Sequence, residues 1–197
     1  LAVVGEEPDL NMQSDLAKEG VTCVVCHAAT HAYADASPGR LTFDFKGPMR
    51  GPLYGTLDEV VPDGAVIATS PFHATVRSEL QSSSELCGSC HMSTWPTNGL
   101  PIDWTYMEWA ESDYAKEGVT CQSCHMETYR GRAAPSAPVR DNLHDHRFPG
   151  RSSVEMVRAT ATLQVTLSED KKEGVARVEN VGAGHAFPTG NATAPSV

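Results

Sequence analysis

The chain has few basic residues, few aromatic residues and no long apolar run. Its 15 Lys and Arg residues are outnumbered by 25 Asp and Glu residues, which gives a formal net charge of −10. Nucleic acid is therefore excluded as an expected partner, because phosphate binding needs a basic surface. No apolar run approaches the roughly 20 residues of a membrane-spanning helix, so we expect no transmembrane segment. With aromatic residues at only 7%, the peptide alone would build a thin core.

Cysteine is absent outside a single motif. All 6 cysteines belong to copies of Cys-x-x-Cys-His, at Cys23–His27, Cys87–His91 and Cys121–His125. This motif is typical of covalent c-type haem attachment. The alternative is a set of zinc sites built on Cys-x-x-Cys knuckles, but such knuckles do not need a histidine fixed at the next position in every copy. The sequence therefore predicts three c-type haems.

The spacing of the motif suits haem attachment. In a helical turn the two cysteines share a face and can reach the two vinyl groups along one haem edge. The histidine that follows brings an imidazole nitrogen beneath the iron as the proximal axial ligand. The expected haem-binding residues are Cys23, Cys26, His27, Cys87, Cys90, His91, Cys121, Cys124 and His125. We expect no catalytic residues.

The first and third motifs lie in an internal repeat. Residues 17–27 read AKEGVTCVVCH and residues 115–125 read AKEGVTCQSCH, so nine of eleven positions are identical. The identity extends beyond what the haem motif requires, which indicates an internal duplication. The central motif lacks this lead-in, so we expect it to have a different part in the haem arrangement.

Three haems would supply the apolar bulk that the peptide lacks. The 13 prolines and 16 glycines favour loops that wrap cofactors over long regular helices. We expect a mainly α and irregular, haem-packed multihaem cytochrome c fold with a small C-terminal β-hairpin or partial β-sandwich. The trihaem domain would span residues 1–152. Residues 153–197 would form the hairpin segment, which is also interpreted as the start of a truncated β domain.

Local patterns predict the elements of these domains. Residues 28–70 are expected to be mostly irregular, residues 72–92 to be helical, and residues 101–116 to form an aromatic helix. Apolar and polar residues alternate over residues 163–167, which predicts a half-buried strand. A charged turn and a second strand over residues 175–181 would complete a β-hairpin.

Of the 8 histidines, those outside the motifs are candidate distal ligands of the irons: His31, His73, His144, His146 and His185. His73 is placed at the expected start of a helix. His146 is favoured over His144, because His146 leads into a turn that could fix its direction. Glycines around His185 permit close approach of the backbone to a bulky cofactor. His31 is too near His27 to bind the same haem, but it suits a neighbouring one.

Methionine is the competing axial ligand. Met92 and Met126 directly follow proximal histidines, so neither can cross to the other face of the same haem. The methionines that remain candidates are Met12, Met49, Met107 and Met156.

Three strings resemble those of a known family. Gly-Val-Thr-Cys-x-x-Cys-His-Met at 118–126, His-Arg-Phe-Pro-Gly at 146–150 and Gly-His-Ala-Phe-Pro-Thr-Gly at 184–190 resemble multihaem cytochromes c of the ammonia-oxidation tetrahaem type. The resemblance implies bis-histidine haems in near contact, with His146 and His185 as distal ligands. Some relatives polymerise into extracellular cytochrome nanowires.

These observations predict an electron-transfer protein that is not an enzyme and that relays single electrons along closely packed haems. Its expected partners are redox proteins or identical subunits, as in a filament or a larger complex. Because haem attachment follows export, the expected location is periplasmic or extracellular. The alternative is a multihaem reductase subunit with one open haem site, where His144, Asp145 and Asp141 would supply acid and base groups.

Overall fold

The computed structural model describes residues 20–35, 39–52, 63–67 and 73–190. The chain divides into two compact units, Leu1–Pro101 and Ile102–Val197. The first unit contains the first two Cys-x-x-Cys-His motifs, and the second unit contains the third. In the described ranges we find no apolar helix of membrane-spanning length.

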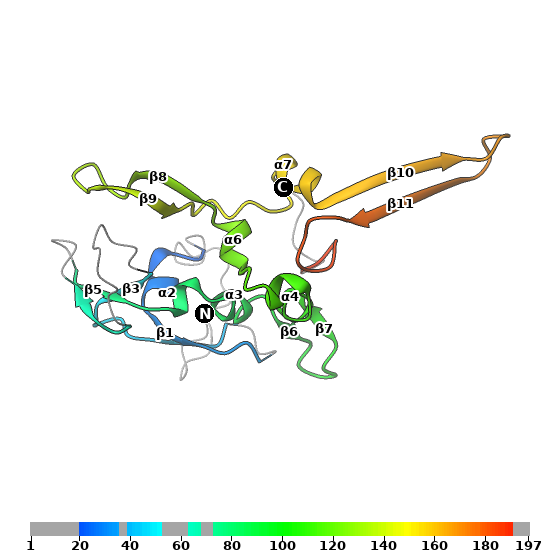
Figure 1. Ribbon diagram of the computed structural model, residues 1–197. Helices are drawn as coiled ribbons and strands as arrows, with labels where there is room; N and C mark the ends of the chain where they lie inside the picture. Colours follow the sequence, from blue (N-terminus) through cyan, green and yellow to red (C-terminus); the bar gives the residue numbers. More distant parts are fainter. Residues whose placement is uncertain (1–19, 36–38, 53–62, 68–72, 191–197) are drawn as a thin grey trace. The chain divides into compact units, whose positions relative to one another are not determined.

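The first unit consists of short strands and single helical turns (Figure 1). Its elements in chain order are α2 (Cys23–His27), β1 (Ala29–Ala32), β2 (Leu41–Phe43), β3 (Met49–Gly51), β4 (Val66–Ile67), β5 (Thr75–Arg77), η1 (Leu80–Ser82), α3 (Ser84–Gly88) and β6 (Ser93–Thr94). Strand β1 pairs antiparallel with β2, with an irregular register between Ala29 and His31. Strand β5 lies between β3, to which it is parallel, and β4, to which it is antiparallel.

The buried apolar core of the described residues is small, as the composition predicts. Its members are Ala28, Ala29, Ala32, Val76 and Met92. Alanines bury little apolar area each, so they contribute little hydrophobic stabilisation. Hydrogen bonds of buried polar side chains stabilise this unit as well. The buried Gln81 side chain donates its Nε2–H groups to the carbonyls of Cys26 and Ala29, at 2.9 and 3.3 Å.

The second unit alternates helical turns with two long β-hairpins (Figure 1). After β7 (Pro101–Asp103), its elements are α4 (Thr105–Ala110), α5 (Asp113–Lys116), α6 (Cys121–His125), β8 (Thr128–Arg132), β9 (Val139–His144), α7 (Val154–Thr160), β10 (Ala161–Leu167) and β11 (Gly174–Asn180). Strands β8 and β9 pair antiparallel with a shift in register between Tyr129 and Gly131.

The prediction of a mainly α fold is wrong. Helix makes up only 23% of the structure, and strand residues outnumber helical ones. Within the described ranges the longest helix, α7, has 7 residues. The Cys-x-x-Cys-His motifs need only one helical turn each, and the helices that contain their first cysteines are 5 residues long.

The helix predicted over residues 72–92 is also wrong in its described part. Strand β5 lies there first, since the β-branched Thr75 and Val76 suit its pairing with Met49 and Arg50 of β3. Helix begins only at Ser84 and ends at Gly88. Residues 28–70 were expected to be mostly irregular, but their described parts contain the short strands β1 to β4. Residues 53–62 and 68–72 lie outside the description.

The helix predicted over residues 101–116 is present in part. Pro101 begins strand β7, and the Asp103 carboxylate then accepts the Thr105 N–H at 3.1 Å where α4 begins. The helix is interrupted before α5, where the Ser112 hydroxyl accepts the Ala115 N–H as an N-cap. Side-chain oxygens that bind main-chain N–H groups therefore split one predicted helix into two.

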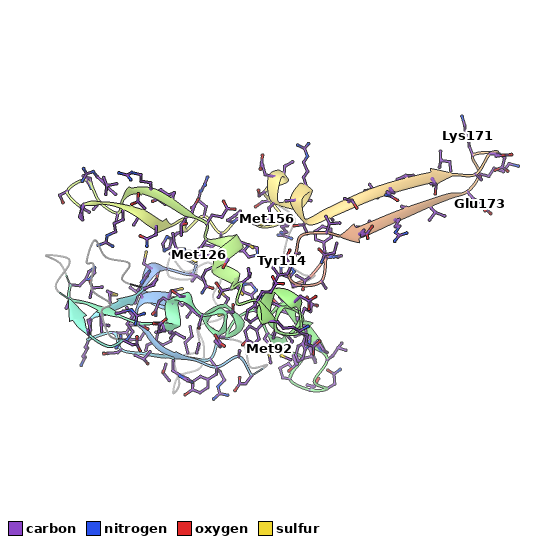
Figure 2. The ribbon with its side chains drawn as sticks, in the orientation of Figure 1. Met92, Tyr114, Met126, Met156, Lys171 and Glu173 are labelled. Atoms are coloured by element: carbon purple, nitrogen blue, oxygen red, sulfur yellow. The ribbon has the colours of Figure 1, made fainter. Side chains whose placement is uncertain are left out.

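The predicted C-terminal hairpin is confirmed, in β10 and β11. Leu163 pairs with Val178 and Val165 pairs with Ala176, so these apolar side chains share one face. The expectation that this face is half-buried is wrong, since Leu163 is 65% exposed. Figure 2 shows Lys171 and Glu173 at the tip of the hairpin. Nothing in the described part of the unit covers the apolar face enough to bury it.

We expect the substitution Leu163→Thr to change the free energy of unfolding by no more than about 0.5 kcal/mol, as for a surface position. The matched substitution Val76→Ala, at a position only 7% exposed, should cost about 1–3 kcal/mol. Chemical denaturation followed by circular dichroism measures both. Equal costs for the two variants would contradict the exposed position of the β10 face.

Candidate haem sites

The first motif forms helix α2, which holds both cysteines and the histidine in one turn. The chain enters it through Thr22 in an extended conformation, with φ −85° and ψ 167°. The His27 ring has its Nδ1 atom 2.5 Å from the Arg50 carbonyl oxygen. A carbonyl oxygen only accepts, so Nδ1 carries the proton and Nε2 is the nitrogen with the lone pair. This tautomer is the one that an Nε2-bound metal requires.

The third motif repeats this arrangement in α6. Thr120 enters the helix with φ −86° and ψ 167°, almost the same values as Thr22. The His125 Nδ1 atom lies 2.7 Å from the Pro149 carbonyl oxygen, so this ring has the same tautomer as His27. Residues 17–19 of the first repeat copy lie outside the described residues. The two described copies nevertheless adopt one local structure.

The duplication extends past the identical sequence. Each motif helix is followed by a β-hairpin, β1–β2 after α2 and β8–β9 after α6. A main-chain bond of 2.9 Å joins the start and end of each hairpin, from Asp44 to Ala28 in one and from Asp145 to Glu127 in the other. In both copies the carbonyl that orients the proximal histidine precedes a glycine and lies far along the chain, at a separation of 23 or 24 residues.

Sequence reasoning missed both orienting carbonyls. Arg50 precedes Gly51, and Pro149 precedes Gly150, so these dipeptides occupy nearly equivalent positions after the two motifs. Aligning the two halves of the chain beyond the identical stretch would have paired them. The residue types differ because the main chain, not the side chain, supplies the acceptor.

The central motif has a different structure. Cys87 lies in α3, and the turn continues through main-chain bonds from Cys90 and His91 to the Cys87 carbonyl, at 3.0 and 2.8 Å. The buried Ser89 hydroxyl donates to the Leu86 carbonyl at 2.8 Å and stabilises this end of the helix. The sequence difference between this motif and the repeat therefore has a structural counterpart.

The first and central motifs lie close together in the first unit. Helices α2 and α3 both pack against β1. Burial raises the pKa of the Cys26 thiol, and the neighbouring Cys90 and Cys23 thiols raise it further. In the third motif, burial raises the pKa of the Cys124 thiol, with smaller effects from Glu127 and Cys121. Both thiols are therefore held in the neutral form at neutral pH in the chain without haem.

Four of the candidate distal histidines lie on β1, just ahead of β5, or at and just after the end of β9. His31 is exposed on β1, with its ring edge-on to Tyr33 at a centroid distance of 4.3 Å. His73 lies in a bend ahead of β5 and not at the start of a helix, with Nδ1 3.2 Å from the Ala74 carbonyl. At the end of β9, His144 Nδ1 contacts the Met126 carbonyl at 2.7 Å. His146 Nδ1 contacts the His144 carbonyl at 2.8 Å.

The fifth candidate, His185, lies beside the proximal histidine of the third motif. The His125 and His185 rings have centroids 6.3 Å apart and planes within 16° of parallel. The His185 Nδ1 atom contacts the Ala186 carbonyl at 2.9 Å, so its tautomer matches that of His125. With metal–nitrogen bonds of about 2 Å, two imidazoles bound through Nε2 to opposite faces of one iron have centroids about 6.3 Å apart. The centroid distance between His125 and His185 therefore matches the spacing required of two axial ligands on one iron.

Asn180 at the end of β11 fixes the loop that carries His185. Its side-chain Nδ2 donates to the carbonyls of Ala183 and His185, at 3.2 and 2.8 Å. Its Oδ1 accepts the N–H groups of Gly182 and Ala183, at 3.3 and 2.9 Å. An asparagine next to a glycine-rich segment is the one sequence feature that pointed to this role.

Two glycines of this loop allow close packing against the protein itself. A Cβ atom on Gly182 would lie 2.3 Å from the Ala159 carbonyl oxygen, and one on Gly184 would lie 3.2 Å from the Tyr114 side chain. The close approach that was predicted for these glycines is therefore made to α7 and α5. This packing sets the position of His185.

Clusters of acidic, cysteine and histidine side chains, and the methionines, are the other groups that could bind a metal. In the described part of the chain, no group of three or more His, Cys, Asp or Glu side chains is placed to hold a metal ion. A haem iron needs only axial ligands from the protein, because the porphyrin supplies the others. Of the candidate methionines, Met49 lies in β3, Met107 in α4 and Met156 in α7, while Met12 lies outside the described residues.

Compared with known proteins, the chain matches no family model, no curated protein and no solved structure.

We predict that Gly182→Ala lowers the free energy of unfolding by about 1–3 kcal/mol, because its new methyl group meets a main-chain carbonyl that cannot move freely. Gly150→Ala is the matched control, since a Cβ atom there meets nothing within 4 Å. Thermal unfolding of both variants provides the measurement. If the two glycines tolerate alanine equally well, the contact between the His185 loop and α7 is not formed in solution.

Proposed function

We propose that this protein is an electron-transfer protein with three covalently attached c-type haems, similar to the multihaem cytochromes c. Three complete attachment motifs that use all 6 cysteines support the haems. When bound, haem iron cycles between ferric and ferrous states and so accepts and releases single electrons. The residues that would hold the haems are the motif cysteines, through thioether bonds, and the proximal His27, His91 and His125.

The observation that carries the electron-transfer role is the His125–His185 pair. Each ring has its Nδ1–H on a carbonyl, so each has an Nε2 lone pair directed by the main chain. A lone pair on one ring cannot form a hydrogen bond with a lone pair on the other. An iron between them would bind both. Two protein ligands on one iron leave no position for a substrate, which favours electron transfer over chemistry at the metal.

The alternative, a reductase with an open haem site, would have to rely on His144, because the two carboxylates predicted beside it are bound to arginines. The Asp145 carboxylate accepts the Arg147 Nε–H at 2.6 Å, and this bond holds the pKa of Asp145 below its usual value. The Asp141 carboxylate is bound to Arg130 at 2.5 Å. The lowered pKa keeps the Asp145 carboxylate ionised near neutral pH, so it is a poor general acid.

A role as a subunit of a filament or larger complex has one observation in its favour, the exposed apolar face of β10 and β11. Identical subunits or another redox protein would be the partners, and the location would be periplasmic or extracellular. Light scattering at high protein concentration tests this role. Monomers alone would indicate an independent electron carrier.

The haem count follows from the motifs. We expect the pyridine haemochrome spectrum and the intact mass to give three haems per chain, and the double variant Cys121→Ser, Cys124→Ser to give two. Val24→Ala, at a variable position inside the first motif, should retain all three and serves as the control. A wild-type chain that binds zinc in place of haem when produced with a haem-attachment system would contradict the proposal.

The axial ligands can be tested by carbon monoxide. We expect no change in the visible spectrum of the reduced wild-type protein, since six-coordinate irons do not bind this ligand readily. His185→Ala should open the third haem alone, so that about a third of the haem binds carbon monoxide. His185→Met should close it again and raise its reduction potential. An unchanged spectrum for His185→Ala would assign the sixth ligand to another residue.

A further inference from the structure

The loop that carries His185 is held on a second side by a carboxylate of α4. The Glu108 Oε2 atom accepts the Ala186 N–H at 3.2 Å and the Thr189 hydroxyl at 2.5 Å. The Thr189 hydroxyl also lies 3.0 Å from the Thr105 hydroxyl on the same helix. One half-buried glutamate therefore joins α4 to two points of the loop, one on each side of Pro188.

Ala186 links this carboxylate to the His185 ring. Its N–H is bound by Glu108, and its carbonyl accepts the His185 Nδ1–H at 2.9 Å. The position of that carbonyl sets both the tautomer and the direction of the ring. A group that fixes the main chain at Ala186 therefore acts on the ring without touching it.

Charge makes this contact stronger than an ordinary one. Hydrogen bonds to an ionised carboxylate are roughly twice as strong as neutral ones. The other anchor of the loop, Asn180, binds residues before Ala186 and leaves the Ala186 N–H to Glu108. Without Glu108, the contact between the Thr189 and Thr105 hydroxyls would be what remains of these attachments to α4.

We propose that Glu108 is a positioning residue that holds His185 in place as the sixth ligand of the third haem. The proposal rests on the proposed function, since it requires a haem on the third motif. Thr189 assists Glu108, because its hydroxyl donates to the Glu108 carboxylate and also lies beside the Thr105 hydroxyl. Glu108 does not touch the haem in this role and takes no part in electron transfer itself.

The test compares Glu108→Ala with Glu108→Gln in the full chain with its haems attached. Reduced Glu108→Ala should bind carbon monoxide at up to a third of its haem and show a high-spin ferric signal in electron paramagnetic resonance. Glu108→Gln retains an acceptor oxygen and should restore the low-spin signal. Glu111→Ala, at the exposed C-cap of the same helix, is the matched control and should behave like wild type.

The outcomes separate the two proposals. Wild-type protein without haem would overturn the proposed function itself. If wild-type protein has three closed haems and His185→Ala opens one, but Glu108→Ala opens none, then only the positioning role fails. A lowered unfolding midpoint with unchanged spectra would make Glu108 merely structural and would also overturn it.

A milder variant keeps the test valid if Glu108→Ala does not fold. Thr189→Val removes one of the two bonds to Glu108 and preserves the shape of the side chain. We expect it to bind carbon monoxide at a smaller fraction of the haem than Glu108→Ala does. If reduced Thr189→Val binds no carbon monoxide, then the position of His185 does not depend on both hydrogen bonds to Glu108, and this result would contradict the proposal.

Discussion

The hydrogen bond from a histidine Nδ1–H to a main-chain carbonyl is the interaction on which the proposed sites depend. It occurs at the proximal His27 and His125 and again at His185. It selects the tautomer whose Nε2 can bind a metal, and it aims the ring by using the most rigid part of the protein. The acceptors for His27 and His125 lie 23 and 24 residues along the chain, so these rings are oriented only when the chain folds, whereas His185 uses the carbonyl of the next residue.

The internal duplication explains why the same local arrangement occurs at the first and third motifs. A helical turn, a β-hairpin and a distant carbonyl recur with nearly the same entry angles at Thr22 and Thr120. The repeated unit is larger than the repeated sequence, because main-chain acceptors impose no particular side chain. The central motif, which lacks the repeat, is stabilised differently by Ser89 and packs beside the first motif.

Weak apolar burial has consequences throughout the described residues. With alanines as the main buried apolar side chains, the peptide relies on hydrogen bonds that Gln81 and Asn180 donate and that Glu108 accepts to hold loops in place. Covalently attached haems would add the apolar bulk that the side chains do not supply.

The three Cys-x-x-Cys-His motifs, the duplication around two of them and the C-terminal hairpin could all be recognised from the sequence alone. These features depend on chemistry and periodicity within short stretches, as in the alternation over residues 163–167. The sequence did not determine the short strands or the broken helix at Ser112, because tertiary pairing and side-chain caps override weak local propensity. Only the tertiary structure decided that His185 pairs with His125 and that Glu108 holds its loop. Those choices rest on contacts between residues far apart in the chain, and no local pattern specifies such contacts.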